Sequence, residues 1–552
     1  MEQVGIVLGT KPISPLEFWI GIEEEHLLQL DDVVYVETAL KDTKVFFYGI
    51  VQDVQKFLEG AESVYDAHLV TRGIIPVNIA YTAKVNVTRV EPEIFVPPSP
   101  GDPVFKATGK HFEKALYYDH MKVKIPAGLT RSGDPIYLNY HFLNGKEGAH
   151  VSISGMSGVA TKTSYALFLL YSLLSKADDV KQGVHGVIFN VKGKDLLWID
   201  KKNKVFSDED RKAFERLGLK PEPFKKVIFY VPPEESDPHI PECERLDDKV
   251  VSFYWSVREF AQEGLIKFMF VEGEEGMSNI NYAIDKVANK LYELAKRSPE
   301  GRLIDDYGRD IESLQDLEKI LEEAIQDKEQ NKSSELYKGW FGDAQLQTAY
   351  AFMRRFHRAS EKIRRLIREN VSSSVKWKEQ KLSVIDISGL HSIAKMFVVG
   401  AILKKIFKEK EESSNPYPKL FVVLDELNKY APKEGWSPIK DIVLDIAERG
   451  RSLGVILIGA QQTASEIEKR VLANSAVKIV GRMDSSEVLS KEYEFLIGNF
   501  RQRAIMLKKG TMIMYQPDVP TPLIFRFPRP PWATKKEEVE EEVHVPEDFN
   551  NF

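Results

Sequence analysis

Short apolar runs separated by turn residues occupy the first 125 positions of the chain. Examples are QVGIVLG, DDVVYVE, KVFFYGIVQ and AKVNVTRV, which are rich in Val, Ile, Phe and Tyr. Several such strands in sequence are typical of a small β-barrel. The prolines of FVPPSPGDP then interrupt the pattern, because proline cannot donate a ladder hydrogen bond. We therefore predict an N-terminal β-barrel over residues 1–125.

From about residue 138 the pattern changes to fully apolar runs that alternate with helical stretches. The apolar runs are AHVSISG, HGVIFNV, LSVIDIS, KLFVVLDE, GVILIGA and AVKIVGR. Strands that are apolar on both faces indicate a parallel sheet with helices on each side. The predicted fold class is α/β, with one core built from residues 138–235 and 375–520.

Residues 245–370 have a helical pattern instead. NYAIDKVANKLYELAKR and QDLEKILEEAIQD carry apolar residues at steps of three and four. We predict a helical subdomain inserted into the α/β core. Residues 521–552 form a predicted C-terminal arm and an acidic tail.

Composition narrows the class of protein. Lys and Arg number 76 and Asp and Glu 83, so the net charge of −7 argues against a broadly basic nucleic-acid binder, although a local basic channel stays compatible with it. The one cysteine, Cys243, allows no intramolecular disulfide and fits a reducing cytosol. The first residues lack the features of a signal peptide, and no apolar run approaches the ~18 residues of a membrane span. We expect a cytoplasmic protein without a membrane segment.

GMSGVATKTS, residues 155–164, is a candidate phosphate-binding loop. The usual pattern is G-x-x-x-x-G-K-[ST], but Met156 and Thr161 stand where it has glycines. A predicted strand precedes the stretch and a helix follows, which is the geometry that directs backbone N–H groups at phosphates. The loop alone leaves three interpretations open, namely a damaged P-loop, a variant P-loop or an ordinary strand–turn–helix.

Two acids follow the apolar run of KLFVVLDELNKYAP. Asp425 and Glu426 come at the end of a predicted buried strand, where ligands of open α/β sheets bind. In a nucleotide site the first acid supports Mg²⁺ and the second activates the attacking water. Further polar side chains come from IAERGRSLGVILIGAQQ and VKIVGRMD. They are Arg449, Arg451, Gln461, Gln462 and Arg482.

Together these motifs resemble the HerA family of hexameric DNA-translocating ATPases, the HerA/FtsK class. The resemblance rests on VGIVLGTKPISPLEFWIGIEEEHLLQLDDVVYVET, SVIDISGL, VVLDELNKYAP, IAERGRSLGVILIGAQQ and FRFPRPPW. It implies a RecA-like P-loop ATPase core, a ring of six with ATP between subunits, and duplex DNA in the pore. It also implies a NurA-type or other effector nuclease as partner, and a role in DNA end resection during double-strand-break repair.

By position, the resemblance assigns roles to individual residues. Lys162 and Thr163 correspond to the Walker A pair, and Asp425 and Glu426 to the Walker B pair, with Thr163 and Asp425 supporting Mg²⁺. The remaining catalytic residues are then Gln461 as sensor, Arg451 as the arginine that acts on a neighbouring subunit, and Arg482 as a further arginine. The predicted ATP-binding residues are Gly155, Gly158, Ala160, Thr161, Lys162, Thr163 and Ser164.

One departure from the family concerns FNVKGKDLLWID. Relatives usually have an acid in the strand after the first helix, whereas this chain has Asn190, with Asp195 nearby. An asparagine cannot act as a base. Because Glu426, Gln461 and Arg451 are retained, we interpret the loop as a variant P-loop that still supports hydrolysis of ATP.

Candidate DNA contacts come from two places. In MRRFHRASEKIRRLIRE, the spacing puts Arg354, Arg358, Lys362 and Arg365 on one helical face, and we favour a solvated helix whose charges pair with glutamates. The other candidates are Lys192 and Lys194, after the strand FNV.

Two other functions stay open at this point. The ring ATPase can instead belong to an antiviral defence complex, since the sequence does not name the partner. The irregular loop also fits a nucleotide-binding scaffold with weak hydrolysis.

Overall fold

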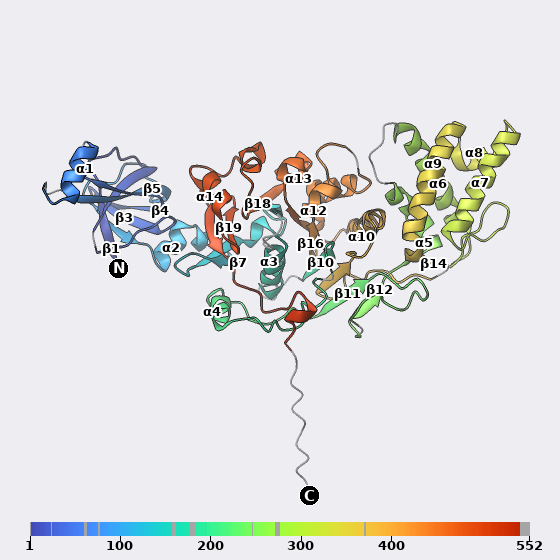
Figure 1. Ribbon diagram of the computed structural model, residues 1–552, viewed down its shortest axis with the longest axis horizontal. Coiled ribbons are helices and arrows are strands. Elements are labelled where there is room, and N and C mark those ends of the chain that lie inside the picture. The colour runs from blue at the N-terminus through green and yellow to red at the C-terminus, as the bar shows by residue number, and fades with distance from the viewer. Residues whose placement is uncertain are drawn as a thin grey trace, which may run out of the picture.

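The computed structural model describes residues 2–23, 25–59, 63–74, 78–156, 162–176, 183–193, 195–245, 247–270, 277–368, 371–435 and 437–540. A small barrel, a large sheet covered by helices and a group of helices follow one another along the long axis in Figure 1. Among the helices of these residues, none offers a stretch long and apolar enough to cross a bilayer.

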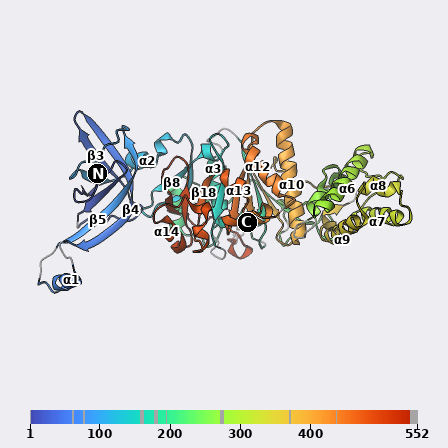
Figure 2. The same cartoon turned by 90° about the horizontal axis from the view of Figure 1, so that it is seen from above.

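The N-terminal strands close into an antiparallel barrel in the order β1-β2-β5-β4-β3-β6, which confirms the predicted barrel. Its strands are β1 (Gln3–Val7), β2 (Glu17–Ile22), β3 (Val33–Leu40), β4 (Thr43–Leu58), β5 (Ile79–Glu91) and β6 (Pro103–Lys106). Alternate side chains such as Phe18, Val34, Phe47 and Val85 fill the interior and are fully buried. β4 and β5 extend beyond the barrel toward α1 (Val64–Thr71), as Figure 2 shows.

The centre of the protein is a twelve-stranded sheet in the order β12-β11-β15-β10-β16-β17-β9-β18-β19-β20-β7-β8. The first eight strands of this order are parallel, as the apolar runs predict. They are β9 (Ala149–Ser154), β10 (Val184–Asn190), β11 (Val227–Val231), β12 (Val250–Ser252), β15 (Leu382–Asp386), β16 (Lys419–Asp425), β17 (Val455–Gln461) and β18 (Ser475–Val480).

Four antiparallel strands extend this sheet, which the sequence did not indicate. They are β7 (Lys124–Leu129), β8 (Pro135–Asn139), β19 (Thr511–Tyr515) and β20 (Leu523–Arg526). β7 and most of β8 precede residue 138, the predicted start of the core, so the sheet begins earlier in the chain than its apolar runs suggested.

Helices cover both faces of the sheet. On one face, α3 (Lys162–Lys176) packs on alternate side chains of the central strands, including Ile153, Val423 and Ile458. On the other, α10 (Ser392–Ser413) and α12 (Lys440–Leu453) cover the complementary set, including Val422 and Leu457. The remaining short helices are α2 (Lys110–Ala115), α4 (Asp208–Arg216), α11 (Leu427–Tyr430), α13 (Lys469–Ala473) and α14 (Phe500–Met506).

A helical subdomain is inserted between β12 and β15 and lies at the far end from the barrel (Figure 1). Its elements are β13 (Trp255–Ser256), α5 (Val257–Gln262), α6 (Met277–Arg297), α7 (Leu314–Gln330), α8 (Glu335–Phe341), α9 (Leu346–Ile363) and β14 (Ile367–Arg368). Ser313 begins α7 with a capping box that includes Asp316, and Leu317, Leu321 and Phe352 are buried between its helices. The apolar steps of three and four in the sequence therefore correspond to real core positions.

A buried ion pair ties down the segment after β10. Arg245 is only 3% exposed, and its guanidinium donates to both carboxylate oxygens of Asp200 at 2.6 and 2.9 Å and to Asp247 at 2.8 Å. Burial acts to raise the pKa of Asp200, but Arg245 and Lys249 outweigh it and hold that pKa below its ordinary value. The pair thus holds a charged segment inside the protein near the loop that follows β10.

Breaking this pair should destabilise the fold. Arg245→Leu leaves the Asp200 carboxylate buried with less compensation, and we expect the free energy of unfolding to fall by about 3 kcal/mol. Urea unfolding followed by tryptophan fluorescence measures the change. As a matched control, Arg364→Leu removes an exposed pair with Glu235 and should cost less than about 1 kcal/mol. Equal effects of the two substitutions would contradict the role of Arg245.

Candidate nucleotide-binding site

The register of the parallel strands brings distant segments to one edge of the sheet. Gln461 pairs with Ser154, Asp425 with Ala460, and Asn190 with Asp386. These residues are the last of their strands, so we call this the carboxyl edge. Open α/β sheets bind ligands at this edge, because loops leaving neighbouring strands converge there.

The candidate phosphate loop leaves β9 between its two neighbours. The Gly155 N–H donates to the Gln461 carbonyl of β17 at 3.2 Å, and the Met156 N–H donates to the Arg482 carbonyl, after β18, at 2.7 Å. A Cβ atom at Gly155 would lie 3.3 Å from that Arg482 oxygen, so a glycine suits this close approach. Gly158, Ala160 and Thr161 lie outside the described residues, and their predicted role stays a prediction.

Lys162 begins α3 and turns back onto the loop. Its ammonium donates to the Gly155 carbonyl at 2.6 Å, and the residue is 6% exposed. Burial lowers the pKa of Lys162 to about 8, while Asp425 opposes the shift. A partly desolvated ammonium at a helix N-terminus is suited to bind an anion such as a phosphate.

Thr163 and Asp425 meet across the sheet. The Thr163 hydroxyl donates to Asp425 Oδ2 at 2.9 Å, although 262 positions separate the two residues. A hydroxyl and a carboxylate are hard oxygen ligands of the kind that Mg²⁺ prefers, with water and phosphate completing its shell. Within the described ranges no group of three or more His, Cys, Asp or Glu forms a metal cluster, which fits a shared site of this type. The two residues therefore fit the predicted Mg²⁺ role. Ser164 follows them on α3.

Glu426 directly follows the strand in an unusual backbone conformation. Its φ of 58° and ψ of 43° are left-handed, which is uncommon for a glutamate and costs about 1–3 kcal/mol. Such strain is found where function holds a residue in place. Lys192 Nζ lies 3.1 Å from Glu426 Oε1 and Lys429 Nζ lies 2.5 Å from Oε2. Burial acts to raise the pKa of Glu426, but the two lysines outweigh it and lower that pKa.

Asn190 scaffolds the loop that carries Lys192. Its amide donates to the carbonyls of Gly193 and Asp195 at 3.0 and 2.6 Å and to Asp386 Oδ1 at 2.9 Å. Asn190 is 3% exposed, so it stands inside the protein where relatives were expected to have an acid. The structure thus places Lys192, a predicted DNA contact, at the carboxyl edge. Lys194 lies outside the described residues.

Gln461 and Arg482 end the two strands that flank β9. The Gln461 side chain is fully buried, and its amide nitrogen donates to the hydroxyls of Ser152 and Ser154 at 2.6 and 3.0 Å. Its Oε1 has no hydrogen-bond partner within the described part of the chain. Gln461 therefore lies against β9, on the face opposite α3, and Gln462 is exposed. The Arg482 side chain is exposed and forms no ion pair with any described residue.

Arg451 lies at the opposite edge of the sheet. It belongs to the last turn of α12, directly before β17 begins, and it donates to the carbonyls of Gly145 and Lys146 at 3.0 and 2.7 Å. The seven residues of β17 separate this position from the carboxyl edge by roughly 20 Å. Arg451 therefore cannot reach the nucleotide edge of its own chain. Arg449 instead pairs with Glu411 of the same chain.

The basic face of α9 lies in the helical subdomain. Arg354, Arg358 and Lys362 are exposed. Arg365 pairs with Glu242, which fits the interpretation of a solvated helix with charges balanced by glutamates.

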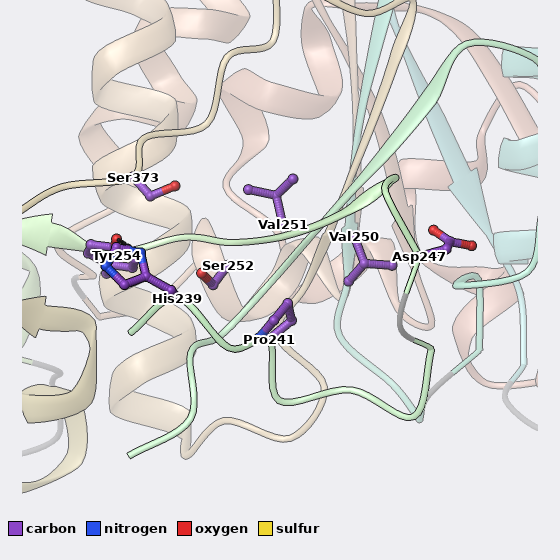
Figure 3. A pocket seen from close by; sticks show the side chains of 8 residues that line it. All are labelled: His239, Pro241, Asp247, Val250, Val251, Ser252, Tyr254 and Ser373. Carbon is purple, nitrogen blue, oxygen red and sulfur yellow. Dashed lines mark hydrogen bonds between the residues drawn. The ribbon is translucent and has the colours of Figure 1, made fainter. Parts of the chain in front are cut away.

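A separate hollow of about 390 Å³ lies at the β12 end of the sheet (Figure 3). Its polar groups bind within the protein: the Ser252 hydroxyl donates to the Pro238 carbonyl at 2.6 Å, and His239 Nδ1 lies 3.3 Å from the Tyr254 hydroxyl. None of the predicted site residues lines it, so we do not assign it to the nucleotide.

Several solved structures are similar to this chain over much of its length. The bacterial conjugative coupling protein TrwBdeltaN70, in complex with sulphate, has a TM-score of 0.49 and 12% identity, covering 75% of this chain and 92% of that one. VirB4 of Thermoanaerobacter pseudethanolicus has a TM-score of 0.44 and 13% identity, covering 74% and 97%. The genome packaging NTPase B204 of Sulfolobus turreted icosahedral virus 2, bound to ATP-gammaS, has a TM-score of 0.21 and 17% identity, covering 28% and 69%.

Neither a protein-family model nor a curated protein matches the chain. At identities below 25% and TM-scores below 0.5, the three structural similarities establish neither a family nor a function. The function of this protein is therefore argued from the geometry of the carboxyl edge.

Sequence reasoning missed three members of the site. Lys429 lies three positions after Glu426, a spacing that could have suggested the ion pair. Lys395, on α10, donates to the Val191 carbonyl at 3.0 Å, and Asp386 ends β15; burial raises the pKa of Asp386. Both depend on contacts between distant segments, which no local spacing reveals.

The Thr163–Asp425 contact predicts how nucleotide binding depends on Mg²⁺. Thr163→Ala removes the hydroxyl, and we expect about a tenfold increase in the Mg²⁺ concentration needed for half-maximal nucleotide binding, in line with the loss of a hydrogen bond to a charged group. Fluorescent-nucleotide titrations at several Mg²⁺ concentrations measure it. Thr163→Ser keeps the hydroxyl and should bind as the unaltered protein does. An unchanged Mg²⁺ dependence in Thr163→Ala would argue against the metal role.

Proposed function

We propose that this protein is an ATP-driven translocase of double-stranded DNA that works as a ring and uses Mg²⁺. The single observation that carries the proposal is the meeting of Thr163 with Asp425 beside Lys162 and Glu426. Lys162 and the loop N–H groups bind phosphate, Thr163 and Asp425 hold the metal, and Glu426 orients and deprotonates water. A scaffold that only binds nucleotide would have no use for a strained glutamate at this place.

The finer parts of the proposal rest on the HerA resemblance. They are a homo-hexamer in the cytoplasm, a NurA-type nuclease as partner, and DNA end resection in double-strand-break repair. The position of Arg451 at the edge opposite to its own site supports a ring, because a head-to-tail neighbour would bring that arginine to the next nucleotide. Gln461 and Arg482 complete the proposed catalytic set, and Lys192 and Lys194 stay predicted DNA contacts.

The first test is phosphate release with and without linear duplex DNA. Glu426→Gln should bind ATP normally and lower turnover by about 100-fold or more, because the general base is lost. Lys162→Ala should lose ATP binding as well. Normal turnover in Glu426→Gln would contradict the mechanism, and ATP binding without release in the unaltered protein would favour the scaffold.

A second test addresses the neighbouring subunit. Arg451→Ala and Lys162→Ala should each be inactive alone, but mixed rings should regain part of the activity, because an intact Walker site can then face an intact Arg451. The activity of mixtures at several ratios measures this effect. Arg449→Ala is the matched control on the same helix and should keep most activity, since Arg449 pairs within its own chain. Mixtures that stay inactive would contradict action across the interface.

A further inference from the structure

Positive side chains outnumber carboxylates around Glu426. Electrostatic interactions connect Lys162 and Lys192 with Asp425 and Glu426, and they connect Lys395 with Lys429, Glu426 and Asp386. Even when Asp386 is counted as ionised, four lysines face three carboxylates. A partly buried cluster with excess positive charge is stabilised by an anion, and the terminal phosphate of a nucleotide supplies one.

Lys192 differs from the other lysines because its backbone is fixed while its side chain is free to turn. The Asn190 amide binds the carbonyls on either side of Lys194, and Lys395 binds the Val191 carbonyl. Gly193 has a φ of 60°, a left-handed turn that glycine adopts without strain. The Lys192 side chain itself is 47% exposed, so its ammonium can move without any rearrangement of the loop.

The ammonium of Lys192 lies between the water-activating acid and the metal-supporting acid. It is 3.1 Å from Glu426 Oε1 and 3.8 Å from Asp425 Oδ2, the oxygen that also accepts the Thr163 hydrogen bond. With Lys429 on Oε2, both oxygens of Glu426 are occupied. In this arrangement Glu426 has no free oxygen to accept a proton from water.

We propose that Lys192 is a latch on Glu426 which the terminal phosphate of a bound nucleoside triphosphate releases. This inference rests on the proposed ATPase function. The phosphate carries more negative charge than the carboxylate and would lie beside Asp425, within reach of the same ammonium. Lys192 then turns from Glu426 Oε1 to the phosphate, and Lys429 keeps Glu426 oriented through Oε2. A diphosphate has no terminal phosphate at this place and leaves the latch closed. Lys192 is thus a positioning residue that couples the presence of the third phosphate to activation of water.

Equilibrium binding tests the contact with the third phosphate. Affinities for ADP and for the β,γ-imido analogue of ATP are compared in the unaltered protein, Lys192→Ala, Lys192→Arg and Lys212→Ala. We expect Lys192→Ala to bind the ATP analogue about tenfold more weakly with ADP affinity unchanged, as for the loss of one charge-assisted hydrogen bond. Lys192→Arg should restore the preference. Lys212, an exposed lysine of α4, is the control and should leave both affinities unchanged.

A double-mutant cycle tests the competition between Glu426 and the phosphate. Glu426→Gln frees the ammonium, so the ATP analogue should bind more tightly than in the unaltered protein. In Lys192→Ala/Glu426→Gln this gain should be clearly smaller. An equal gain in both backgrounds would show that Lys192 does not exchange between the two partners.

The outcomes separate this inference from the proposed function. If the unaltered protein does not bind the ATP analogue, the proposed function itself fails. If it binds, but Lys192→Ala keeps the same ratio of ATP-analogue to ADP affinity, or weakens both nucleotides equally, only the latch is overturned.

Discussion

A hydrogen bond between the Thr163 hydroxyl and the Asp425 carboxylate is the contact on which the candidate site depends. It joins the start of α3 to the end of β16, two elements that are neighbours only because β17 pairs with both β9 and β16 in parallel register. A shift of one residue in either pairing would turn Asp425 to the opposite face of the sheet. The fully apolar sequences of these strands oppose such a shift, because α3 on one face and α10 and α12 on the other fix which side chains point where.

The left-handed glutamate and the lysines around it follow from this constraint. Asp425 has to end the strand in order to reach Thr163, and Glu426 must then turn sharply to face the same edge. The strain is held by the surrounding fold and by two ion pairs on its carboxylate. Asn190 belongs to the same arrangement, since it gives up the role of an acid and instead shapes the loop that delivers Lys192. The variant features of the sequence thus lie next to one another in space.

Much of the fold could be predicted from local patterns. Apolar runs and helical spacing indicate the barrel, the parallel strands and the inserted helices, because burial on one face or two leaves a direct trace in the sequence. The antiparallel strands β7, β8, β19 and β20 were missed, since short half-buried strands at the edge of a sheet leave a weak trace. Within the site, motifs indicated Lys162, Thr163, Asp425 and Glu426. The placement of Lys192 beside Glu426, and of Arg451 at the far edge, depends on strand order and direction, which no spacing along the chain encodes.

The central claim is that a nucleotide binds at the carboxyl edge between β9 and β16. A cryo-electron microscopy structure of the protein with Mg²⁺ and the β,γ-imido analogue of ATP tests it most directly. The account predicts the phosphates against Lys162, the metal between Thr163 and Asp425, and the Lys192 ammonium on the terminal phosphate. A nucleotide bound elsewhere, with Thr163 still donating to Asp425 and no metal between them, would contradict it.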